Sequence, residues 1–89
     1  MTVGGSPTQL IERAKAEVAS IARSAAESVQ VVSVEAMDWS DSSLGCPKAG
    51  MMYAQVITPG YKIVLDSGGR TYDFHTGLDP DGPLVRCGG

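Results

Sequence analysis

The sequence predicts a two-layer α+β domain, in which one N-terminal helix packs across an antiparallel meander sheet of four or five strands. Three observations favour this arrangement. The first third of the 89-residue chain carries one amphipathic helical pattern, and the remainder alternates in strand-like runs. Turns rich in Gly, Pro and Asp separate those runs, which is typical of consecutive hairpins. A lone amphipathic helix buries its apolar stripe against one face of such a sheet.

The helix is predicted to begin with a capping box and to end near Glu27 or Ser28. Ser6 is a favoured N-cap, Pro7 suits the first helical position, and Gln9 stands three residues after the cap. Apolar residues then recur at helical spacing, and we expect them to form the buried face of the helix. These residues are Leu10, Ile11, Ala14, Val18, Ile21, Ala22 and Ala25.

Strand-like runs rich in β-branched and aromatic residues follow the helix. In the first run, Val32, Val34 and Ala36 are expected to share one face. In the fourth run, Tyr72 and Phe74 share a face, so we expect His75 to point to solvent from the other face. The predicted strands cover residues 29–37, 52–57, 61–65, 70–76 and 84–87.

Four connections join these strands. A long loop at 38–50 follows the first strand, and a Thr-Pro-Gly turn at 58–60 joins the second strand to the third. The pair Gly68–Gly69 in the turn 66–69 is a hairpin signal. A second loop, 77–83, precedes the short last strand. We expect residues 1–5 to be a flexible tail and residues 6–89 to form a single domain.

Composition limits the possible partners. The net charge is −3 and the seven basic residues are scattered, which argues against nucleic-acid binding. No apolar run reaches the roughly 18 residues that a membrane span needs. Residues 1–7 contain neither a basic nor an apolar signal-peptide segment, so a cytoplasmic location stays open. Exposed edge strands are compatible with a monomer or a weak dimer.

The chain contains two cysteines, Cys46 and Cys87. A disulfide between them would close a loop of nearly half the chain, which is worth roughly 4 kcal/mol in the chain-entropy model. Two unrelated thiols in a reducing cytosol are the alternative. Two cysteines and one histidine fall short of the four ligands of a structural zinc site, so we expect no metal and no cofactor.

The segment between Trp39 and Tyr61 is rich in the residue types expected of a functional surface. It contains the only Trp, Cys46 and two tyrosines. Gly and Pro residues restrict its backbone, and a loop stiffened before binding loses less entropy on binding. Alternatively, Trp39, Leu44 and the disulfide form a small core that closes the end of the sheet. The predicted binding residues are Leu44, Gly45, Cys46, Pro47, Lys48, Met51, Met52, Thr58, Pro59, Gly60 and Tyr61.

An enzymatic interpretation rests on Cys46 and His75. A reactive thiolate needs a base or a cation nearby, and Asp73 could orient the imidazole. However, Cys46 precedes a proline in a loop and has a disulfide partner. We therefore expect a protein that is not an enzyme.

Two families resemble this sequence. The first resemblance is carried by Trp39-x-Asp-x-Ser-Leu-Gly-Cys-Pro47, by Tyr53-x-Gln-Val-x-x-Pro-Gly-Tyr61 and by Tyr72-x-x-His-Thr76. In these motifs, residues 29–87 resemble a family of small bacterial proteins without an assigned activity. Many of its members are exported or lipid-anchored, so the resemblance implies an extracytoplasmic, periplasmic or secreted setting and supports the disulfide.

The second resemblance is architectural and is to the cystatins, which inhibit papain-like cysteine proteases. Their inhibitory wedge combines an N-terminal glycine, a Gln-x-Val-x-Gly hairpin and a Pro-Trp hairpin. Gly4 or Gly5 is similar to the first element, and Gln55–Gly60 is similar to the second but one residue longer. No Pro-Trp follows. PepSY-type domains share the helix-then-meander order, so the fold alone selects no function.

The sequence is therefore interpreted as a small binding module, with a protease inhibitor as the most specific hypothesis. Leu44, Lys48, Met51 or Met52 would supply the side chain that enters a protease pocket. In the alternative, a structural or small-ligand accessory domain, Trp39, Tyr53 and Tyr61 line a shallow groove or fill the core.

Overall fold

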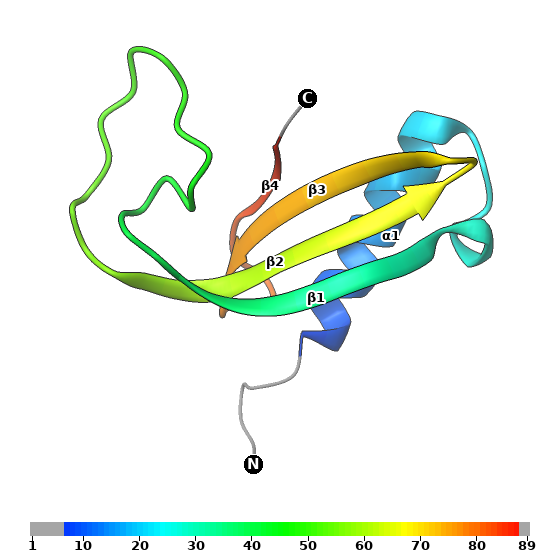
Figure 1. Ribbon diagram of the computed structural model, residues 1–89, viewed down its shortest axis with the longest axis horizontal. Coiled ribbons are helices and arrows are strands. Elements are labelled where there is room, and N and C mark those ends of the chain that lie inside the picture. Colours follow the sequence, from blue (N-terminus) through cyan, green and yellow to red (C-terminus); the bar gives the residue numbers. More distant parts are fainter. Residues whose placement is uncertain (1–6, 88–89) are drawn as a thin grey trace.

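A computed structural model describes residues 7–87. Helix α1 (Thr8–Ala22) and a 3₁₀ turn, η1 (Ala26–Ser28), precede a four-stranded antiparallel sheet. The strands are β1 (Gln30–Trp39), β2 (Thr58–Ser67), β3 (Arg70–Gly77) and β4 (Leu84–Cys87), and they lie side by side in chain order. Figure 1 shows α1 crossing behind the sheet, which confirms the predicted α+β class. Within residues 7–87, no helix is long and apolar enough to cross a membrane.

Helix α1 is shorter than its sequence pattern predicts. It ends at Ala22 because Arg23 adopts the left-handed conformation (φ 55°) and its backbone N–H bonds the carbonyl of Ala19. The predicted extension to Glu27 or Ser28 is therefore wrong, and a separate 3₁₀ turn occupies its end.

The start of α1 is held by the loop before β4. The predicted cap residue Ser6 lies outside the described residues, and the amide of Gln9 donates to the Asp81 carboxylate (3.3 Å). Arg13 donates from Nη1 to the carbonyls of Pro80 (2.8 Å) and Gly82 (2.9 Å). These long-range bonds dock the N-terminal half of α1 onto the 78–83 connection.

The core lies between α1 and the central strands β2 and β3. Three helix residues, Leu10, Ala14 and Val18, are fully buried, as their spacing predicts. Ile21, expected on the same stripe, is 42% exposed because the helix passes the edge of the sheet there. The remaining core residues come from η1's end and the strands: Val29, Ile63, Leu65, Tyr72 and Phe74.

Strand β1 forms one edge of the sheet and contains a bulge. The register with β2 shifts between Val31 and Ser33, which leaves Val32 without a partner and 57% exposed. Val34 packs against the core, but Ala36 is exposed. The bulge therefore interrupts the single face that the sequence predicts for these three residues.

Two predictions about the segment after β1 are wrong. Residues 52–57 form no strand, and residues 58–60 are the first residues of β2 rather than a turn. Strand β1 pairs directly with β2, from Trp39 opposite Thr58 to Gln30 opposite Asp66. Consequently, residues 40–57 form one long connection, which we call the 40–57 loop.

The connections between β2 and β3 and between β3 and β4 agree with the predictions made from the sequence. Gly68 and Gly69 form a two-residue hairpin with φ values of 60° and 86°, as the primed turns of hairpins require. In the 78–83 connection, the amide of Gly82 bonds the Asp79 carbonyl, and the amide of Asp81 bonds the Asp79 carboxylate. This compact turn returns the chain to β4, which pairs with β3.

Candidate functional site

The 40–57 loop leaves the sheet where β1 stops and rejoins it where β2 begins (Figure 1), and Leu44 of this loop contacts His75 of β3. Alternation along β3 places Tyr72 and Phe74 toward the helix, and Asp73 and His75 toward the loop. The loop therefore turns an otherwise open face into a second, smaller buried layer.

Trp39 and His75 form the centre of this second layer. Their rings are stacked, with centroids 4.4 Å apart and an interplanar angle of 18°. Both are buried, at 7% exposure each. The indole Nε1 donates to the carbonyl of Thr76 (2.9 Å), so its polar atom is satisfied. The expectation that His75 faces solvent is wrong, because the loop closes over its side of the sheet.

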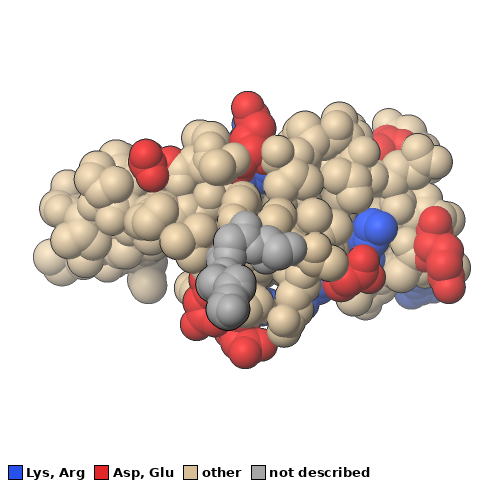
Figure 2. All heavy atoms as spheres, turned by 90° about the horizontal axis from the view of Figure 1, so that it is seen from below, with Lys and Arg blue, Asp and Glu red and all other residues tan. Residues whose placement is uncertain are grey.

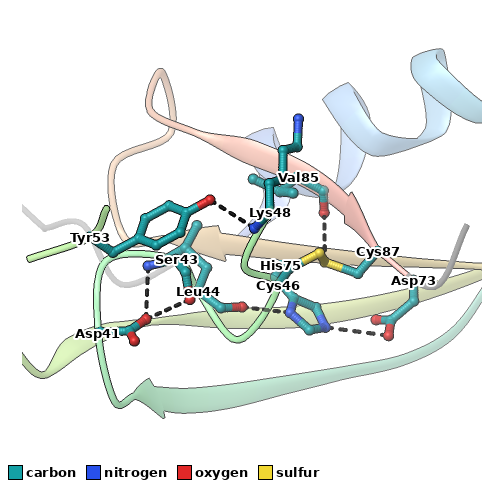
Figure 3. The surroundings of a disulfide bond; sticks show 10 residues. All are labelled: Asp41, Ser43, Leu44, Cys46, Lys48, Tyr53, Asp73, His75, Val85 and Cys87. Atoms are coloured by element: carbon teal, nitrogen blue, oxygen red, sulfur yellow. Dashed lines mark hydrogen bonds and ion pairs between the residues drawn. A yellow bond between two sulfur atoms is a disulfide. The ribbon is translucent and has the colours of Figure 1, made fainter. Parts of the chain in front are cut away.

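Both nitrogens of His75 face acceptor oxygens. Nδ1 lies 2.6 Å from the carbonyl oxygen of Leu44, and Nε2 lies 3.3 Å from Oδ2 of Asp73. Since a carbonyl only accepts, Nδ1 carries the proton and donates to Leu44. Figure 3 shows the imidazole between these two partners, next to the disulfide. The ring links the carbonyl of Leu44 in the loop to the carboxylate of Asp73 on β3.

The backbone at Leu44 and Gly45 is turned so that the loop can reach His75. Both residues have positive φ, 59° and 72°. A Cβ on Gly45 would lie 2.9 Å from two carbon atoms of the Trp39 ring, so this position requires glycine. The Leu44 side chain is 4% exposed. It packs in the interior and cannot enter a protease pocket in this conformation.

The disulfide between Cys46 and Cys87 is present, with the two Cα atoms 6.0 Å apart. It joins the 40–57 loop to the last residue of β4, as predicted. Neither cysteine is free. Thiol chemistry at Cys46 would require this bond to be reduced first.

The 40–57 loop is also closed onto itself. The amide of Ser42 bonds the carbonyl of Ala54 (3.0 Å), and the amide of Ala54 bonds Oγ of Ser42 (2.8 Å). Further out, the amide of Lys48 donates to the Tyr53 hydroxyl (3.0 Å), and the amide of Met51 donates to the Lys48 carbonyl (3.2 Å). Such closure is typical of Ω-loops, whose ends meet while their tips project.

Residues 47–53, which we call the loop tip, are the exposed part of this structure. Met52 is 95% exposed and Met51 is 60% exposed. Val56 (56%) and Ile57 (67%) extend the apolar surface toward β2. Four of the eight exposed large hydrophobic residues of the described chain thus belong to this one loop. The loop tip is therefore the candidate contact surface.

The predicted binding residues separate into three groups, of which Leu44, Gly45 and Cys46 form the base of the loop. Pro47, Lys48, Met51 and Met52 are exposed on the loop tip. Residues 58–61 belong to β2, where Gly60 is buried and Tyr61 packs against the helix-side core. The proposed aromatic groove is not formed, because Trp39 lies in the loop-side layer, Tyr53 braces the tip and Tyr61 lies on the opposite face.

Asp41 supports the buried start of the loop by capping a turn, the ordinary role of a loop carboxylate. Its carboxylate accepts hydrogen bonds from the hydroxyl and the backbone N–H of Ser43. These bonds hold the pKa of the Asp41 carboxyl below its ordinary value, the hydroxyl bond contributing most and burial opposing slightly. An Asp two residues before a Ser is a recognisable turn signal.

The comparison with known families identifies the domain. A family profile described as a domain of unknown function (DUF8738) matches residues 11–87, which includes α1 from its second turn, the whole sheet and both cysteines. The chain belongs to this family. No curated protein and no solved structure matched the chain. This DUF8738 domain is thus assigned a family and a fold, and its function has to be argued from the site.

Proposed function

We propose that this DUF8738 domain is a non-enzymatic binding module that presents the loop tip to another protein, with a protease as the most specific target class. The observation that carries the proposal is Met52, whose side chain is 95% exposed on a loop fastened at several points. An exposed methionine on a mobile loop would cost conformational entropy on binding. In this domain, the base of the loop is already held in place in the free protein, so binding loses less conformational entropy.

Three contacts hold the base of the 40–57 loop in place. Cys46 is bonded to β4, Leu44 is held by His75, and Ser42 is paired with Ala54. Each contact lies at the base of the loop, so none needs to be broken for a partner to reach residues 47–53. A partner would therefore meet a preformed surface.

A protease is favoured because the tip combines exposure with irregular backbone. Residues 51–55 belong to no helix or strand, so a cleft could pair with their backbone groups. Met52, Met51 or Lys48 would supply the side chain for the specificity pocket. The disulfide beside the tip would keep a cleaved loop in place, which slows the release of products. We further propose an extracytoplasmic location, where such a disulfide persists.

The test is a panel of purified serine and cysteine proteases, assayed with and without the domain at equimolar and tenfold excess. We expect at least one protease to be inhibited, and the loop to be cut only slowly by that protease. Met52→Asp should abolish inhibition. Ile21→Asp is the matched control, because it places the same charge on an exposed apolar position of α1, away from the loop.

A structural accessory role is the competing proposal. It is favoured by the burial of Trp39 and Leu44, at 7% and 4% exposure, in a layer that closes the end of the sheet. In that case, every protease of the panel should be unaffected and should cut the tip as an ordinary exposed segment. Mass spectrometry of the digests distinguishes the two proposals, because rapid cleavage between residues 47 and 53 without inhibition contradicts the inhibitor.

A further inference from the structure

A shallow hollow of about 150 Å³ lies at the end of the β1–β2 pair, next to the base of the 40–57 loop. Residues 36–38 of β1, residues 59–61 of β2 and Leu78 line it, and no residue of α1 takes part. Its volume is below the roughly 300 Å³ at which pockets for drug-sized ligands begin. It suits the end of one side chain.

The strand register explains why the hollow exists. Ala36 is opposite Tyr61, and Asp38 is opposite Pro59, so these four side chains share the helix-side face of the sheet. Helix α1 packs over Ile63 further along β2 and does not reach this end of the strands (Figure 1). Among the described residues, none of α1 covers this end, and a recess lies between the two strands and Leu78.

The chemistry of the lining is apolar with one negative group. Pro59 and Leu78 supply apolar walls, Tyr61 supplies an aromatic ring, and Asp38 supplies a carboxylate. No basic residue lines the hollow. An aliphatic stem can lie along apolar walls while its charged end meets a carboxylate, which is how lysine side chains are accommodated on proteins. An aromatic ring adds attraction for a cation.

The charged residues that neighbour the lining in the sequence are mostly acidic, with Lys62, which follows Tyr61, as an exception. Asp79 directly follows Leu78, and Asp81 lies in the same connection. Arg13 of α1, which contacts that connection, uses its guanidinium to bond the carbonyls of Pro80 and Gly82. Figure 2 shows acidic side chains more prominently than basic ones on the underside of the molecule. This field attracts a cation and repels an anion.

We propose that the hollow binds a lysine side chain of a partner protein, with the ammonium group at Asp38 and the aliphatic stem against Pro59, Tyr61 and Leu78. This site uses none of the residues of the loop tip. The lysine-binding proposal can therefore be tested independently of protease inhibition.

The test is a titration of the ¹⁵N-labelled full chain with Nα-acetyl-lysine methylamide at constant ionic strength, followed by amide chemical shifts. The matched probe is the norleucine analogue, which keeps the stem and lacks the ammonium group. We expect saturable shifts at Asp38, Tyr61 and Leu78 with the lysine probe only. Asp38→Asn should weaken binding about two- to fivefold, as expected for an exposed ion pair. Asp66→Asn, at the opposite end of β2, should leave it unchanged.

Three results would overturn the proposal: no saturable shift at the hollow, equal shifts with norleucine, or equal affinity in wild type and Asp38→Asn. Leu78→Ala provides a second variant should Asp38→Asn disturb the edge strand, and it should also weaken the lysine probe. Met52→Asp should bind the probe like wild type. A domain that binds the probe but inhibits no protease retains the lysine site and loses only the function proposed for the tip.

Discussion

The indole of Trp39 lies flat on the imidazole of His75, although the two residues belong to strands separated by β2. Trp39 is the last residue of β1, and His75 is near the end of β3. The stack and the bond from the indole to Thr76 therefore tie the sheet crosswise at the end where the 40–57 loop leaves it. This pair is the base on which Leu44, Gly45 and the disulfide are assembled.

We first predict that Trp39→Ala detaches the loop from the sheet. Removing a buried Trp typically costs about 3–5 kcal/mol in the free energy of unfolding. Trp39→Phe keeps a stacked ring but leaves the Thr76 carbonyl without its donor, so it should cost about 1–3 kcal/mol. Urea denaturation followed by circular dichroism measures both. Equal stability of the Ala and Phe variants would contradict the role of the stack.

The second prediction concerns the disulfide. In intact-mass measurements of the native protein, a thiol-alkylating reagent should add no mass until a reductant is present. Replacing both cysteines, Cys46→Ser with Cys87→Ser, should lower the free energy of unfolding by about 4 kcal/mol, because the unfolded chain regains its loop entropy. Alkylation of both thiols in the untreated protein would remove the anchor on which the preformed loop tip depends.

The elements that the sequence predicted well are those whose signal is local. The stripe Leu10, Ala14 and Val18 depends only on helical period, and the Gly68–Gly69 hairpin depends only on backbone freedom. Both are confirmed. The disulfide was also predictable, since two cysteines in a small domain allow only one pairing.

The errors occurred where tertiary contacts outweigh local preference. Residues 52–57 have a strand-like composition, but β1 pairs with residues 58–67 and leaves them no partner strand. His75 alternates away from the helix, yet the loop covers it, and no local pattern shows that a segment thirty residues earlier returns to that face. For the same reason, Leu44 could not be separated from the exposed residues beside it.

A third prediction uses two glycines that face each other across β2 and β3. Gly60 is opposite Gly77 in the register, but only Gly60 is crowded. A Cβ on Gly60 would lie 1.8 Å from the Thr76 carbonyl oxygen, whereas a Cβ on Gly77 would meet nothing within 4 Å.

Gly60→Ala should therefore force the β2–β3 pair apart and cost roughly 3 kcal/mol or more in stability, while Gly77→Ala stays within about 0.5 kcal/mol of wild type. Thermal and urea unfolding of the two single variants make the comparison. A Gly60→Ala protein as stable as its Gly77→Ala control would show that the close approach of the strands is not required.

The last prediction follows from the lowered pKa of Asp41. Because the folded state favours its ionised form, Asp41 contributes stability above its unfolded pKa, and that contribution is lost as pH falls through the lower folded pKa. The start of the loop should therefore become less stable in acid, below the ordinary pKa range of aspartate.

The variant Ser43→Ala removes the hydroxyl donor and keeps the backbone donor, so the pKa of Asp41 should rise toward its ordinary value without reaching it. Ser42→Ala is the control, because the Ser42 hydroxyl bonds Ala54 rather than Asp41. An NMR titration of the Asp41 carboxyl carbon measures the pKa in each variant, and an unchanged value in Ser43→Ala would refute the assigned cause.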